Sequence, residues 1–170
     1  AMTMTDTTIR LASAADATTI FNFIQALATY EREPDAVDAT PESISQQLEA
    51  DHPPFECLLA EVKGEPRGFA LFFHNYSTWR GKQGIYLEDL FVPENYRGEG
   101  IGKLLLATLA RIAAERDCPR LEWQVLDWNQ TAIDFYESLG TKVMRDWLPC
   151  RLTDQELSKL ADQGATVEAR

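Results

Sequence analysis

The chain has 170 residues, of which 45% are hydrophobic, and this length suits one domain with its own buried core. Its formal net charge of −11 argues against nucleic-acid binding, which needs a basic face, and favours a cationic partner. The sequence has no cationic segment followed by an apolar one and no apolar run of about 18 residues, so it indicates neither export nor membrane insertion. We expect a single domain over residues 1–170, flexible at 1–7 and 162–170, in a cytoplasmic protein.

The first part of the chain predicts one strand and two helices. Residues 8–12 suit a short strand, and a capping box then opens a helix whose apolar residues recur at helical spacing until about Tyr30. An acidic loop follows over residues 31–38. Thr40 then caps a second helix, with Pro41 at its first position.

The middle of the chain predicts a hairpin, a further strand and a long helix. Residues 55–62 and 67–75 read as two strands joined by a tight turn. Residues 85–92 are rich in strand-forming types and stop at Pro93, which cannot donate a ladder hydrogen bond. From Ile101 onward, apolar residues again recur at helical spacing.

The last part of the chain predicts further strands and two helices. A strand over residues 121–126 leads into a helix over 131–139, with Gly140 just after its end. Residues 142–152 should form the last strands, with a hairpin bend near their middle. A capping box then opens a short helix that continues to about Ala161.

A glycine-rich loop, Arg97-Gly-Glu-Gly-Ile-Gly102, joins the predicted strand 85–92 to the helix that follows. It places bare backbone N–H groups and the positive end of the helix dipole together, an arrangement that favours a phosphate. A Walker loop is excluded, because Arg97 replaces its first glycine and Leu104 replaces its Ser or Thr. The dinucleotide fingerprint fits poorly, because its third glycine would fall at Lys103. A turn without a ligand would not need three alternating glycines.

This loop, preceded by a strand that carries Glu88 and Asp89, resembles the acyl-CoA loop of the GNAT family of N-acetyltransferases. Residues 128–140 resemble the second signature of that family, in which Asn129 opens a helix and Tyr136 follows one to two turns later. Tyr30-Glu31, Trp79 and residues 86–89 are similar to the spermidine/spermine (diamine) acetyltransferase branch. The resemblance covers about residues 8–152.

The resemblance implies an α/β (α+β) domain with the GNAT fold. Its mixed, mostly antiparallel central sheet would splay at the acetyl-CoA site, with helices on both faces. Relatives suggest a homodimer. Acetyl-CoA would be the co-substrate, held by residues at the strand end, in the loop and at the later helix: Leu90, Phe91, Val92, Arg97, Gly98, Glu99, Gly100, Ile101, Gly102, Lys103 and Asn129.

Three residues are candidates for proton transfer in such a reaction. A primary ammonium with a pKa of about 10.4 must lose a proton before its nitrogen can attack a thioester, so a base is needed. Glu88 is the favoured base, acting through water, and Asp89 would bind the cation, although the two roles are interchangeable. Adjacent strand residues point to opposite faces unless a bulge intervenes, and the resemblance implies such a bulge. Tyr136 matches the general acid of the family, although it also suits packing beside Phe135.

The acceptor is expected to be a small cationic amine bound by Glu31, Trp79 and Asp89. A polyamine or diamine leads, but residues 76–78 lack an acidic residue that the polyamine branch carries, so a thialysine-like amino acid is the alternative. A non-catalytic acyl-CoA-binding module is a further alternative. His52, His74 and the three cysteines lack ligand spacing, so no metal is expected.

Overall fold

The computed structural model describes residues 6–169. The chain divides into two compact units, one ending at Gln124 and the other beginning at Val125, and each is described by itself. Part of the predicted terminal flexibility concerns residues 1–5 and 170, which lie outside the described residues. Within the described part of the chain, no helix has the length and apolar character needed to cross a bilayer.

The first unit contains the predicted helices and strands in the predicted order. Its elements are β1 (Thr7–Leu11), η2 (Ala14–Asp16), α1 (Ala17–Tyr30), α2 (Pro41–Glu49), β2 (Glu56–Val62), β3 (Glu65–Ser77), β4 (Lys82–Phe91), η3 (Glu94–Tyr96), α3 (Ile101–Glu115) and β5 (Leu121–Glu122). The predicted start of α2 is confirmed, because the Thr40 side chain accepts a hydrogen bond from the Ser43 N–H and Pro41 is the first helical residue.

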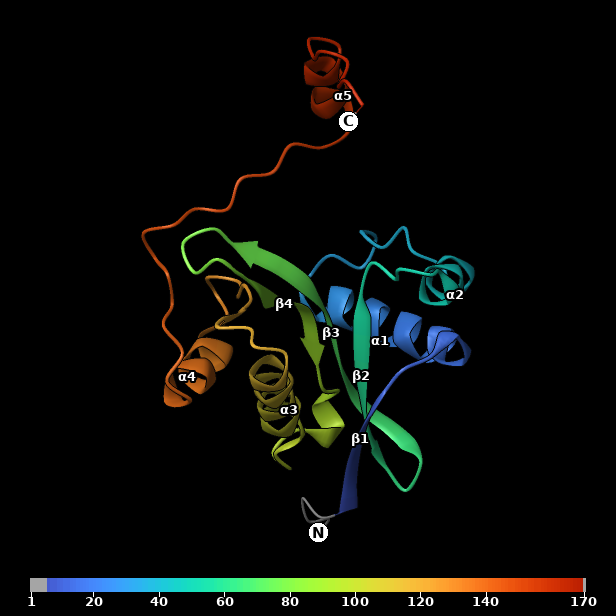
Figure 1. Ribbon diagram of the computed structural model, residues 1–170. Helices are drawn as coiled ribbons and strands as arrows, with labels where there is room; N and C mark the ends of the chain where they lie inside the picture. Colours follow the sequence, from blue (N-terminus) through green and yellow to red (C-terminus); the bar gives the residue numbers. More distant parts are fainter. Residues whose placement is uncertain (1–5, 170) are drawn as a thin grey trace. The chain divides into compact units, whose positions relative to one another are not determined.

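The five strands form one mixed sheet in the order β1-β2-β3-β4-β5. Strands β1 to β4 pair antiparallel, and β5 pairs parallel with β4 (Figure 1). The predicted mixed, mostly antiparallel sheet is therefore confirmed. The predicted strand over 121–126 is wrong in length, because only Leu121 and Glu122 join the ladder.

Helices cover both faces of this sheet, as predicted. One face packs against α1 and α2 through a core cluster that includes Phe23 of α1, whose ring stacks on Phe69 of β3 at 5.2 Å between centroids. Helix α3 contacts the sheet with its own apolar side, which buries Leu105 and Leu109 completely. In Figure 1, α1 and α2 lie on one side of β2 and β3 and α3 lies on the other.

The second unit contains α4 (Gln130–Ser138) and α5 (Asp154–Ala161). The strands predicted over residues 142–152 are wrong, since no strand forms there in the described part of this unit. A turn forms instead, in which the Arg145 N–H donates to the Val143 carbonyl and the Trp147 N–H to the Met144 carbonyl. The predicted bend thus exists, but the flanking residues have no ladder partner, without which a strand does not form.

Candidate functional site

The pairing of β3 with β4 is interrupted at Glu88. Leu71 pairs with Asp89 and Phe72 with Leu87, so Glu88 is an extra residue in β4. This is the bulge that the family resemblance implied, and it changes where the neighbouring side chains point. Cross-strand partners share a face, and Phe72 and Ala70, the partners of Leu87 and Leu90, lie on one face of β3. Leu87 and Leu90 therefore share one face of β4, and Glu88 and Asp89 both lie between them in the chain.

The charges of two other carboxylates reach Asp89 in the first unit. Burial, then the charge of Glu88 and then that of Glu31 raise the pKa of Asp89 to about 6. Glu31 directly follows the last residue of α1, and burial raises its pKa as well. Like charges held together without a counterion disfavour ionisation, and a bound cation would reverse this effect. The arrangement therefore fits a positively charged ligand, and two of the three predicted acceptor contacts, Glu31 and Asp89, are brought together.

Strand β4 loses its partner on one side just before these carboxylates. Its parallel pairing with β5 covers only Ile85 and Tyr86. Within the described residues, β5 does not extend to pair with Leu87–Phe91. The end of β4, with the predicted contacts Leu90 and Phe91, is thus paired by β3 alone, and Val92 follows directly after the strand. Backbone groups that lack a strand partner are suited to hydrogen bonds with an extended amide chain.

The glycine loop after β4 forms the N-terminus of α3 as predicted. Gly98 and Gly100 have φ values of +84° and +81°, in the region that favours glycine, and Gly100 is the residue that precedes the helix. Gly102 has no such requirement, and a Cβ built on it would meet only the Val92 Cγ2 at 3.9 Å, an ordinary contact. The fold itself leaves room for a side chain there. Its absence fits close approach of a phosphate to the first N–H groups of α3, and Glu99 and Lys103 flank this position with exposed side chains.

The Arg97 side chain folds back over the end of β4. Its Nε donates to the Val92 carbonyl at 2.8 Å, and its guanidinium lies 4.7 Å from the Tyr30 ring centroid and 5.6 Å from that of Phe91. Arg97 thereby links the loop to the end of α1, beside Glu31. The sequence singled out Tyr30 only through its neighbour Glu31, and the aromatic contact itself leaves no pattern in the sequence.

Trp79 lies apart from the carboxylates. It belongs to the turn that joins β3 to β4, and its side chain is 83% exposed. The turn begins after Ser77, and Leu71, the partner of Asp89, lies six residues earlier, which corresponds to roughly 20 Å along a strand. Within the first unit, the structure does not bring Trp79 to Glu31 and Asp89.

The two remaining site residues belong to the second unit. The Asn129 side chain caps α4 by accepting a hydrogen bond from the Ala132 N–H at 3.3 Å. Tyr136 lies on the same helix, and its ring centroid is 5.5 Å from that of Phe135. Both are positioned by α4, as the sequence predicted.

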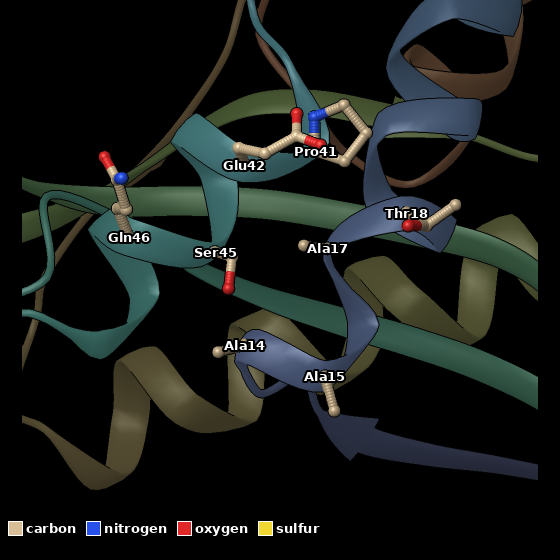
Figure 2. A pocket seen from close by; sticks show the side chains of 8 residues that line it. All are labelled: Ala14, Ala15, Ala17, Thr18, Pro41, Glu42, Ser45 and Gln46. Atoms are coloured by element: carbon tan, nitrogen blue, oxygen red, sulfur yellow. The ribbon is translucent and has the colours of Figure 1, made fainter.

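A shallow hollow of about 410 Å³ lies between the start of α1 and α2 (Figure 2). Small and polar residues line it: Ala14, Ala15, Ala17, Thr18, Pro41, Glu42, Ser45 and Gln46. None of them is a predicted site residue, and the hollow plays no part in the arrangement around β4.

Comparison with known sequences identifies the family of this chain. Residues 19–141 match the acetyltransferase (GNAT) family. A thialysine N-epsilon-acetyltransferase of Sus scrofa is 35% identical over 93% of this chain and 99% of its own length. An L-ornithine N5-acetyltransferase of Arabidopsis thaliana is 48% identical over 55% of this chain and 41% of its own. A spermidine/spermine N(1)-acetyltransferase-like protein of Homo sapiens is 34% identical over 90% of this chain and 23% of its own.

Solved structures share the fold. An integron cassette protein from the mobile metagenome of V. cholerae aligns with a TM-score of 0.76 at 27% identity, over 92% of this chain and 98% of its own. An aminoglycoside N-acetyltransferase solved in complex with CoA aligns with a TM-score of 0.70 at 20% identity, over 86% and 94% of the two chains.

Proposed function

Because the chain belongs to the acetyltransferase (GNAT) family and is an acyltransferase that acts on amines, we propose that its acceptor is a small, cationic primary amine. A polyamine or diamine is the first candidate. The observation that carries the proposal is the half-buried Asp89, whose carboxyl feels the charges of Glu88 and Glu31, at the strand end that leads into the glycine loop. A buried carboxylate with acidic neighbours is costly unless a cation joins it.

Acetyl-CoA would bind along the end of β4 and at the N-terminus of α3. Its pyrophosphate would accept hydrogen bonds from the loop N–H groups, supported by the helix dipole and by Arg97 and Lys103. The backbone of Leu90 and Val92 would bind the amide chain of the cofactor. Local donors are needed, because the formal net charge of −11 repels phosphates at longer range.

Proton transfer would be divided between the carboxylates and Tyr136. Asp89 and Glu31 hold the cation, while the exposed Glu88 takes a proton from the reacting ammonium through a water molecule. The neutral nitrogen then forms a bond to the acetyl carbon as the carbon–sulfur bond breaks, and it loses its second proton to water as the amide forms. By resemblance to the family, Tyr136 would return a proton to the thiolate, because a tyrosine phenol, with a usual pKa of about 10, carries its proton at neutral pH.

A thialysine-like amino acid is the second candidate. It is favoured by the likeness to the thialysine N-epsilon-acetyltransferase, which extends over 99% of that protein. Such an acceptor also presents a primary amine on a short alkyl chain, but it carries a carboxylate that the three acidic residues would repel. The two candidates therefore differ in the charge at the end remote from the reacting amine.

An acetylation screen over putrescine, spermidine, thialysine, ornithine and butylamine would test the acceptor class. Release of CoA thiol reports turnover with every amine. We expect diamines and polyamines to give the highest kcat/KM. Preference for the amino acids would favour the second candidate, a thialysine-like acceptor. Turnover with none of the cationic amines would contradict the proposal.

Tyr136→Phe tests the proposed acid. The substitution removes one hydroxyl and little volume, so kcat should fall by about 10²-fold while KM for acetyl-CoA changes little. Tyr76→Phe, at an exposed tyrosine of β3, is the matched control and should leave kcat unchanged. Unchanged turnover in Tyr136→Phe, measured where chemistry is rate-limiting, would return Tyr136 to a packing role.

A further inference from the structure

Gly68, inside β3, lies where the two halves of the proposed acetyl-CoA site meet. It pairs with Ala60 of β2, and its neighbour Phe69 pairs with Phe91 at the end of β4. Its φ lies outside the left-handed region, so its backbone conformation does not call for glycine. The reason for a glycine here must therefore lie in its surroundings.

A side chain at Gly68 would crowd both halves of that site. A Cβ built there would lie 3.2 Å from three atoms: the Ile101 Cγ2, the Phe91 carbonyl oxygen and the Val92 Cγ2. Phe91 and Val92 end the strand that would bind the amide chain of the cofactor. Ile101 is the first residue of α3, whose N–H groups would bind the pyrophosphate. Gly68 thus lies against both the end of the strand and the start of the helix.

Relief of this crowding would shift these neighbours by a few tenths of an ångström. The Phe91 oxygen is itself a backbone atom, and the methyl groups of Ile101 and Val92 are on β-branched side chains, which have few rotamers. We propose that Gly68 is a positioning residue for acetyl-CoA: its bare backbone sets the spacing between the end of β4 and the N-terminus of α3. This inference rests on the proposed function, because it assigns Gly68 to the cofactor site.

Gly84 offers a matched control for the general cost of crowding. It also lies in the sheet, and a Cβ there would be 2.7 Å from the Asn75 Oδ1 and 3.2 Å from the Arg120 carbonyl oxygen. It is found near the start of β4, at the end of the strand remote from the glycine loop. Crowding at Gly84 should therefore destabilise the fold without reaching the cofactor site.

The experiment measures acetyl-CoA binding and turnover in Gly68→Ala and Gly84→Ala. Overpacking of this kind should weaken acetyl-CoA binding by about tenfold in Gly68→Ala and raise its KM, with a much smaller change in KM for the amine. Gly84→Ala should lower the melting temperature but keep the wild-type KM for acetyl-CoA. A folded Gly68→Ala with wild-type affinity, or equal loss in both variants, would overturn the inference.

A second substitution tests the cause and covers the case in which Gly68→Ala does not fold. Ile101→Leu removes the crowding Cγ2 while keeping an apolar side chain, so it should restore part of the lost affinity when combined with Gly68→Ala. A double variant with no recovery relative to the two single variants would contradict the proposed contact. Failure of the wild-type protein to bind acetyl-CoA would instead refute the proposed function, so the two failures are distinguishable.

Discussion

Asp89 shows how a single residue connects stability with substrate binding. Its raised pKa means that the folded protein holds a proton on this carboxyl up to about pH 6, whereas the unfolded chain releases it near the ordinary value of 3.8. Between these values the folded state binds more protons, so this group makes the protein less stable as the pH rises from about 4 to about 6. Above pH 6 the loss is complete and constant.

Asp89→Asn should therefore stabilise the free protein at pH 7. The neutral amide removes a charge that burial and two neighbours disfavour, and the gain should be on the order of 1–3 kcal/mol. Denaturant unfolding at pH 7 and pH 4 would measure it, and the gain should vanish at pH 4.

The same variant should bind a diamine poorly at pH 7. In the wild type, KM for the amine should rise as the pH falls below 6, and Asp89→Asn should lose this dependence. Lower stability of Asp89→Asn at pH 7 would contradict the assignment.

At the scale of elements, α3 is fixed to the sheet at both ends. Its first residue packs on Gly68, and Arg116, just after its last turn, makes a double hydrogen bond to Glu56 of β2 at 2.6 and 2.9 Å. Arg116 holds the pKa of Glu56 below its usual range. Charge-assisted pairs with two parallel bonds add geometric precision as well as energy. The position of the helix start beside the end of β4 thus depends in part on a contact at the far end of the helix, remote from the glycine loop.

Gly102→Leu tests the use made of this helix start. Leucine is a better helix former than glycine by about 1 kcal/mol, so the variant should not be less stable. Its side chain would occupy the space beside Val92 that we assign to the cofactor, and acetyl-CoA affinity should fall at least tenfold. The acetyl-CoA affinity of Gly102→Ala, whose Cβ has room, should lie between those of Gly102→Leu and the wild type. Calorimetric titration against acetyl-CoA decides, and undiminished binding in Gly102→Leu would contradict the phosphate site.

Elements with strong local signals could be predicted from the sequence. Helical spacing and caps gave α1, α2, α3 and α5, and Pro93 marked the end of β4 within a residue or two. The strands over residues 142–152 could not be predicted correctly, because the segment itself carries no information on whether a ladder partner is present. The predicted length of β5 was wrong for the same reason.

The part of the candidate site whose residues are contiguous in the chain could be predicted. The glycine loop and the Glu88-Asp89 pair are contiguous in the chain, and their neighbours follow from strand and helix geometry. The bulge at Glu88 came from family resemblance, since alternation alone would place the two carboxylates on opposite faces. Gly68 carried no sequence signal, because a glycine needed for a close approach between elements looks like any other glycine in a strand. The distance between Trp79 and Asp89 depended on strand register, which the sequence left open.

At the scale of the whole molecule, the excess of negative charge acts together with the local carboxylates. A formal net charge of −11 attracts cationic amines over distances comparable to the screening length, about 8–10 Å at physiological salt. This general attraction does not distinguish a diamine from another cation. Discrimination has to come from groups at fixed positions, and Glu31 is suited to this because it lies at the end of α1, apart in the chain from the pair on β4.

Glu31→Gln should therefore lower kcat/KM several-fold for a diamine and spare a monoamine of similar length. The amide keeps the shape of the side chain but removes the charge that would face the distal ammonium, and a partly desolvated ion pair contributes more than the ~0.2–1 kcal/mol of an exposed one. Glu33→Gln, an exposed acidic neighbour in the same loop, is the matched control for net charge. Added salt should narrow the difference between diamine and monoamine in the wild type, because screening weakens the distal contact. If zwitterionic amino acids were acetylated well, diamines poorly, and Glu31→Gln changed neither, the acyltransferase would remain but its acceptor would not be a polyamine.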